Sequence, residues 1–140
     1  MVNGFQFKVC GLTRARDAQA AAEAGADFLG FIFYPKSPRN LRIERYRDIL
    51  ERLPDVPRVA VTVAPDLYTL SELEAAGFDY FQIHFPMGLS EEVETWAGVV
   101  GKERLWLAPK APPGSTFDAE LLKSASGVLW DAYKPDADTY

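Results

Sequence analysis

The sequence of 140 residues contains one cysteine, Cys10, and one histidine, His84. One cysteine cannot form an internal disulfide, and one cysteine with one histidine cannot build a thiolate zinc site. No apolar run approaches the roughly 20 residues of a membrane-spanning helix. Residues 1–6 lack the charged and apolar regions that open a signal peptide. These absences predict a cytoplasmic protein that does not interact with a membrane.

Basic residues are also few, because 15 lysines and arginines face 20 aspartates and glutamates, for a net charge of −5. This balance excludes the basic surface that non-specific binding of nucleic acid requires. The first strand-like segment is not followed by a glycine-rich dinucleotide fingerprint, and the sequence has no P-loop, which argues against a nucleotide-binding fold. Length and composition predict one globular domain over residues 1–140.

The chain consists of strand-like apolar segments that alternate with helical segments. Such alternation predicts an α/β protein with a parallel sheet and helices outside it. The spacing does not distinguish a (β/α)₈ barrel from a doubly wound sheet. The predicted strands are 7–12, 27–33, 58–63, 80–85, 104–108 and 128–133, and the predicted helices are 14–24, 41–53, 66–76, 90–101 and 117–126.

Cys10 lies at the end of the first predicted strand, where Gly11 begins a turn and Thr13 is the expected helix cap. The carboxyl ends of parallel strands are where α/β proteins bind their ligands. A free cysteine usually packs as a small hydrophobic residue. A lone cysteine in an intracellular chain is also a candidate thiol base or nucleophile. Position alone leaves both interpretations open.

Two long motifs carry a resemblance to a known family. Residues 8–13 read KVCGLT and residues 24–39 read AGADFLGFIFYPKSPR, and they are followed by Gln82-Ile83-His84 and Leu129-Trp130-Asp131. In this order, along the whole chain, they resemble the phosphoribosylanthranilate isomerases of tryptophan biosynthesis. The resemblance implies a (β/α)₈ TIM barrel, of which this chain would supply about six strands and five helices.

The resemblance also implies an activity, the Amadori rearrangement of N-(5-phosphoribosyl)anthranilate to an aminoketose phosphate, without a metal or an organic cofactor. Cys10 would remove the proton from sugar C2, and Asp131 would protonate the ring oxygen. Arg39 would hold the anthranilate carboxylate, for which a guanidinium is a bidentate partner. Gln82 and His84 would complete the substrate site.

Each of these residues also has an ordinary structural interpretation. Asp131 can cap the end of its strand, Arg39 can be a surface charge, and His84 can be a hydrogen-bonded structural residue. The tryptophans Trp96, Trp106 and Trp130 are expected to pack in the core or between helix and sheet.

The family continues after the strand of Asp131 with a glycine motif and two further βα units, which bring phosphate-binding amides, whereas this sequence stops at Tyr140. We therefore expect the 140-residue chain to be a weak or inactive isomerase. We also expect an open sheet whose exposed edges and apolar residues, such as Phe31, Phe33 and Val63, promote self-association. The alternatives are a non-catalytic partial barrel that self-associates, and a related sugar-phosphate-binding barrel in which Cys10 only packs.

Overall fold

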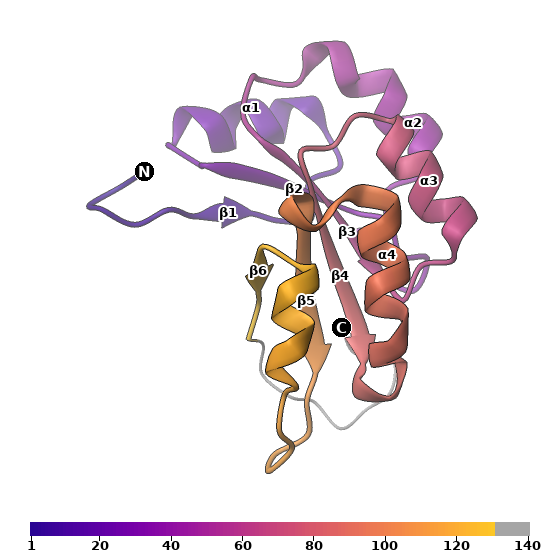
Figure 1. The fold of residues 1–140 in the computed structure, drawn as a ribbon. Helices are drawn as coiled ribbons and strands as arrows, with labels where there is room; N and C mark the ends of the chain where they lie inside the picture. The colour runs from indigo at the N-terminus through magenta and orange to yellow at the C-terminus, as the bar shows by residue number, and fades with distance from the viewer. Residues whose placement is uncertain (131–140) are drawn as a thin grey trace.

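The computed structural model describes residues 1–130, and in them six parallel strands form one sheet (Figure 1). The strands follow one another in the order of the sequence, each beside the next. A doubly wound sheet reverses its strand order at a switch point, so this order decides between the two architectures in favour of a barrel wall. The strands are β1 (Lys8–Val9), β2 (Phe28–Ile32), β3 (Arg58–Val63), β4 (Tyr80–Pro86), β5 (Leu105–Lys110) and β6 (Gly127–Val128).

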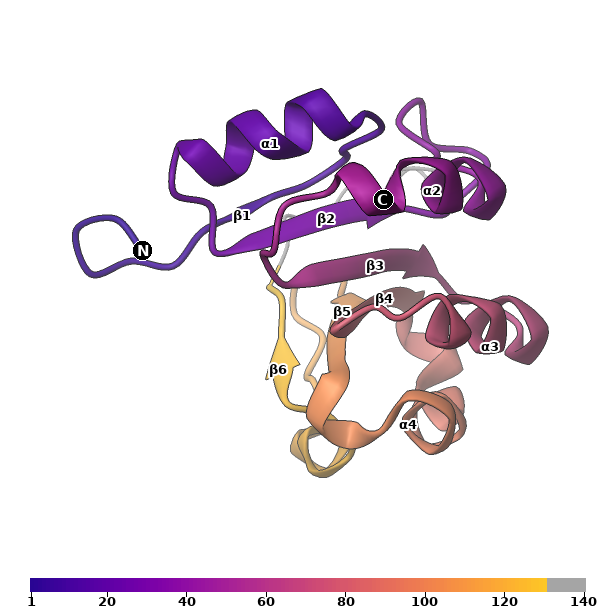
Figure 2. The ribbon, with the colours of Figure 1, turned by 90° about the horizontal axis from the view of Figure 1, so that it is seen from above.

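The helices lie on the convex side of the curved sheet, which leaves the concave side for the interior (Figure 2). The α-helices are α1 (Ala15–Glu23), α2 (Ile43–Ile49), α3 (Leu67–Ala75) and α4 (Val93–Val100). Short 3₁₀ helices are η1 (Leu50–Arg52), η2 (Met87–Glu92), η3 (Lys102–Arg104) and η4 (Ala119–Ser124). The fifth predicted helix is thus the 3₁₀ segment η4. No helix within residues 1–130 combines the length and apolar character that crossing a membrane requires.

Two predicted helix starts have different outcomes. The Asp66 carboxylate accepts a hydrogen bond from the Thr69 backbone N–H at 2.7 Å, which confirms Asp66 as the cap of α3. This hydrogen bond lowers the pKa of Asp66. The predicted cap of α1 by Thr13 is wrong, because the N-cap residue is Arg14 and no side chain caps the helix. Instead the Arg14 guanidinium donates to Asp17 in the first turn at 2.8 Å.

The core lies between the sheet and its helices and is rich in aromatic side chains. Phe31 is fully buried, and its ring packs edge-on against Tyr46 of α2 at 5.3 Å between centroids. Phe33 packs against Tyr46 and Phe78 at 5.9 and 5.4 Å. Burial raises the pKa of Tyr46 to about 12. The expectation that Phe31 and Phe33 are exposed on the sheet is wrong, because alternate strand residues face opposite sides and these two face the helices.

The concave face has an aromatic end and a polar end. At the aromatic end, Tyr80 stacks on Trp106 with ring centroids 4.6 Å apart, and Phe28 packs edge-on against both. Trp96 packs instead in the core on the outer side, 1% exposed and 5.4 Å from Phe85. These contacts confirm packing roles for Trp96 and Trp106. These aromatic side chains do not fill the polar end of the face, where the strands terminate, so a ligand can bind there.

The strands at the two edges of the sheet are short. Among the described residues, β1 pairs only with β2 and β6 only with β5, over two residue pairs each. Short edge strands are one way in which proteins limit pairing with other chains. Self-association through these edges stays a prediction.

Candidate active site

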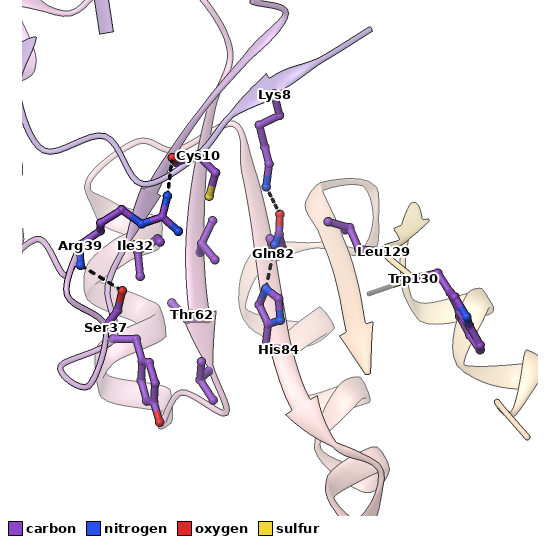
Figure 3. Close-up of a pocket in the computed structure, with 13 residues that line it drawn as sticks. Lys8, Cys10, Ile32, Ser37, Arg39, Thr62, Gln82, His84, Leu129 and Trp130 are labelled. Atoms are coloured by element: carbon purple, nitrogen blue, oxygen red, sulfur yellow. Dashed lines mark hydrogen bonds between the residues drawn. The ribbon is translucent and has the colours of Figure 1, made fainter. Parts of the chain in front are cut away.

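A cavity of about 370 Å³ opens on the concave face at the carboxyl ends of the strands (Figure 3). Four of the five predicted site residues line it. The fifth, Asp131, lies outside the described residues, although its neighbours Leu129 and Trp130 line the same cavity. The predicted residues at the cavity are Cys10, Arg39, Gln82 and His84, and the others include Lys8, Ile32, Tyr34, Ser37, Val61 and Val63.

Cys10 is held at the cavity by the turn that follows β1. The strand ends at Val9, so the predicted strand over residues 7–12 is too long. The backbone N–H groups of Gly11 and Leu12 both donate to the carbonyl of Gly30, each at 3.0 Å. Gly11 has φ +82°, in the left-handed region that favours glycine. This turn fixes the backbone on which the thiol stands.

Gly30 of β2 leaves room for the thiol. A methyl group on Gly30 would lie 2.9 Å from Cys10 Sγ, closer than such atoms approach in proteins, and 3.1 Å from the Cys10 Cα, which is tighter than most contacts of this kind. The absence of a side chain at Gly30 therefore leaves the space that the Cys10 side chain occupies.

Replacing Gly30 by alanine should lower the free energy of unfolding by about 1–3 kcal/mol, the usual cost of overpacking. Urea denaturation measures the change. Gly98→Ala is the matched control, since nothing lies within 4 Å of a methyl group there. In the interior of α4 this substitution should stabilise by up to about 1 kcal/mol. Equal stability of Gly30→Ala and the unsubstituted chain would show that the thiol does not need this space.

Arg39 reaches the same place from the proline-rich loop after β2. Its Nη1 donates to the backbone carbonyl of Cys10 at 3.2 Å, and its own backbone N–H donates to the Ser37 hydroxyl at 3.2 Å. A side chain at Gly11 would collide with the guanidinium, because its Cβ would lie 2.5 Å from Nη1. Gly11 is thus needed for two reasons: it adopts the turn conformation, and it leaves space for the Arg39 guanidinium. The result is a guanidinium lying against the cysteine backbone at one cavity.

A third cluster joins β1 to β4. Lys8 Nζ donates to Gln82 Oε1, and Gln82 Nε2 lies 2.8 Å from His84 Nε2. Burial lowers the pKa of Lys8, and the smaller electrostatic effect of Cys10 opposes that shift. Sequence reasoning assigned no role to Lys8. The signal was present, since Lys8 and Cys10 are two residues apart, and residues at this spacing share one face of a strand.

Trp130 is the second residue whose role at the site the sequence did not indicate. Its side chain is 72% exposed and lines the cavity, so the expectation that it packs in the core is wrong. An exposed indole at a cavity offers a flat apolar surface to an aromatic ligand. Within residues 1–130, no three histidine, cysteine, aspartate or glutamate side chains are grouped as a metal ion would require.

Comparison with known proteins places this cavity in a family. The profile of N-(5'-phosphoribosyl)anthranilate (PRA) isomerase matches residues 7–126. The chain belongs to the PRA isomerase family. An isomerase of that name from Pseudomonas putida is 40% identical over 139 residues, which cover 96% of this chain and 64% of the relative. The chain therefore spans less than two thirds of the length of this PRA isomerase.

Solved PRA isomerases share the fold. The crystal structure from Thermus thermophilus matches 95% of this chain and 65% of its own, with a TM-score of 0.72 and 29% identity. A PRA isomerase in complex with reduced 1-(o-carboxyphenylamino)-1-deoxyribulose 5-phosphate matches 74% of this chain and 52% of its own, with a TM-score of 0.61 and 31% identity. The six consecutive strands within residues 1–130 accordingly correspond to part of the (β/α)₈ barrel of these PRA isomerases.

Proposed function

We propose that this protein catalyses the isomerisation of N-(5-phosphoribosyl)anthranilate to 1-(o-carboxyphenylamino)-1-deoxyribulose 5-phosphate. One observation carries the proposal: Cys10 and Arg39, from separate segments, meet at one cavity, where the guanidinium donates to the cysteine carbonyl at 3.2 Å. The proposed reaction needs a base at sugar C2, which the Cys10 thiol can supply. It also needs a group that binds the anthranilate carboxylate, which the Arg39 guanidinium can supply. The solved family member described above was in complex with a reduced form of this product.

The proposed reaction needs one acid and one base. Asp131 gives a proton to the ring oxygen as the C1–oxygen bond breaks, which leaves an iminium group between C1 and the anthranilate nitrogen. The iminium makes the C2 hydrogen acidic, and the Cys10 thiolate removes it to give an enolamine. A proton returns at C1 while C2 becomes a ketone, so the product is an isomer of the substrate. General acid and base groups of this kind contribute about 10²–10⁴-fold each.

The substrate is anionic, and the cavity carries cations although the chain has a net charge of −5. Arg39 lines it and can bind the anthranilate carboxylate through two parallel N–H groups. Lys8 adds a second positive charge on the concave face. Gln82 and His84 are proposed as polar contacts to the same substrate.

The test is incubation of a full-length version, which also carries the glycine motif and the two further βα units of the family, with N-(5-phosphoribosyl)anthranilate in deuterium oxide, followed by carbon and proton NMR. The proposed reaction converts C2 to a ketone and places one solvent deuterium on C1. Appearance of the ketone with deuterium at C1 supports the function. Binding of the substrate without conversion would overturn the isomerase assignment and favour a barrel that only binds sugar phosphates.

Replacing Arg39 by lysine should raise KM about tenfold and change kcat little, because it removes one of two hydrogen bonds to a carboxylate and no proton-transfer group. Steady-state kinetics measure both constants. Arg42→Lys is the control, since Arg42 follows in the same loop, is largely exposed and has its guanidinium 3.7 Å from the Glu44 carboxylate. A fall in kcat at unchanged KM in Arg39→Lys would contradict the assigned role.

A further inference from the structure

Lys8, Gln82 and His84 form a continuous line of side chains across the concave face (Figure 3). Lys8 comes from β1, whereas Gln82 and His84 come from β4, and β2 and β3 lie between them in the sheet. The lysine therefore spans the interior to reach the glutamine, 74 residues away in the sequence. Gln82 is 4% exposed, so its amide depends on these two partners more than on water.

The chemistry of the three groups fixes the direction of each hydrogen bond. An ammonium group has only donors, so the carbonyl oxygen of Gln82 must face Lys8. The amide NH₂ of Gln82 then faces His84, and it too can only donate. His84 Nε2 therefore accepts, which leaves it without a proton. In a neutral imidazole the single proton must then be on Nδ1.

We propose that Lys8 is a positioning residue which, acting through Gln82, holds His84 as the neutral tautomer protonated at Nδ1. Turning the Gln82 amide over would bring its NH₂ against the ammonium, donor against donor, at a buried position. Lys8 thereby fixes the orientation of Gln82, and Gln82 fixes the proton of His84. Neither effect requires Lys8 to contact a substrate.

This arrangement has a consequence for recognition, which rests on the function proposed above. A histidine fixed in this form can only donate at Nδ1, so whichever group lies against Nδ1 must be a hydrogen-bond acceptor. The oxygens of a carboxylate, a phosphate or a sugar hydroxyl satisfy this condition. The positive Lys8 at the other end of the line favours anions in the same cavity.

The tautomer is measurable in the protein itself by a long-range proton–nitrogen correlation on ¹⁵N-labelled protein at neutral pH. The sequence contains a single histidine, and loss of its signals in His84→Gln confirms the assignment. We expect Nδ1 in the range of a protonated ring nitrogen and Nε2 in the range of an unprotonated one. A ring protonated mainly at Nε2, or at both nitrogens, would overturn the proposal without any variant.

Two substitutions test the line itself. Gln82→Glu places a carboxylate oxygen against Nε2 and should move the proton there. Lys8→Met keeps the apolar stem but removes the donor, so Gln82 can turn over and both tautomers should be populated. Lys123→Met is the control, because Lys123 pairs with Glu120 on the surface and its loss should leave the His84 spectrum unchanged. A wild-type spectrum in either of the two test variants would overturn the role of the residue replaced.

The measurement needs no substrate, which separates it from the proposed function. If the protein fails to isomerise N-(5-phosphoribosyl)anthranilate and His84 is nevertheless protonated at Nδ1, the function is wrong and the positioning role stands. If isomerisation occurs and His84 is protonated at Nε2, the function stands and the positioning role is wrong.

Discussion

Replacing Cys10 by alanine in a full-length version should reduce kcat for the proposed isomerisation by about 10²–10⁴-fold, the usual contribution of a positioned base. The loss should fall on the chemical step, because the guanidinium of Arg39 contacts the carbonyl of residue 10, which alanine retains. Turnover at saturating substrate measures the effect. Thermal unfolding followed by circular dichroism measures whether the fold is kept.

Cys10→Ser is the matched variant for this experiment. It replaces the thiol by a hydroxyl of similar shape that is a far weaker acid, so the residue stays protonated and cannot take up the C2 proton. Both variants should fold, since the side chain of Cys10 is only partly buried and lines the cavity. Near-native turnover in Cys10→Ala would assign the thiol to packing, which is the commoner role of a free cysteine.

Replacing Asp131 by asparagine in the same full-length version should reduce kcat by a similar factor, about 10²–10⁴-fold. The amide has nearly the size of the carboxyl group but no proton to give to the ring oxygen, so ring opening loses its acid. This prediction comes from the Leu129-Trp130-Asp131 motif and from the position of Leu129 and Trp130 at the cavity. It is measured by turnover at saturating substrate.

The control for Asp131→Asn is Asp48→Asn, on the exposed side of α2. It makes the same chemical change away from the cavity and should leave kcat unchanged. The need for a proton donor can also be bypassed, because a substrate that is already in its open-chain form does not require protonation of the ring oxygen. An open-chain analogue turned over equally slowly by Asp131→Asn would mean that Asp131 has a different role.

The sequence predicted best those elements whose signals are local. The β-branched run Arg58–Val63 is β3 with the predicted bounds, and Asp66 caps α3 as expected. The start of α1 was misplaced because Thr13 and Arg14 are neighbours and only the backbone angles decide which residue is the cap. Within residues 1–130, β1 and β6 each pair on one side, and β1 is shorter than the predicted strand 7–12 because strand length depends on pairing partners. Of the sixth predicted strand, 128–133, residues 131–133 lie outside the described residues.

Site residues that lie within a sequence motif could be predicted. Contacts between side chains from distant strands could not be predicted, because they depend on how the sheet is assembled. The motifs singled out Cys10 and Arg39, and both lie at the cavity. The side of the sheet that Phe31 faces depends on register, and a shift of one residue reverses it. The contact of Lys8 with Gln82 crosses two intervening strands, and only the curvature of the sheet makes it short enough.

The two glycines beside the thiol limit how this sequence can change over evolutionary time. A side chain at position 11 must displace Arg39, and one at position 30 must displace Cys10. Each glycine therefore packs against one polar residue, and Gly11 is required in addition by its φ of +82°, which strains any other residue whatever the space. Loss of the thiol at position 10 removes the closest contact of a side chain at position 30, whereas the contact with the Cα of residue 10 at 3.1 Å remains. Position 30 should therefore vary only together with position 10, whereas position 11 should remain glycine whichever residue stands at position 39.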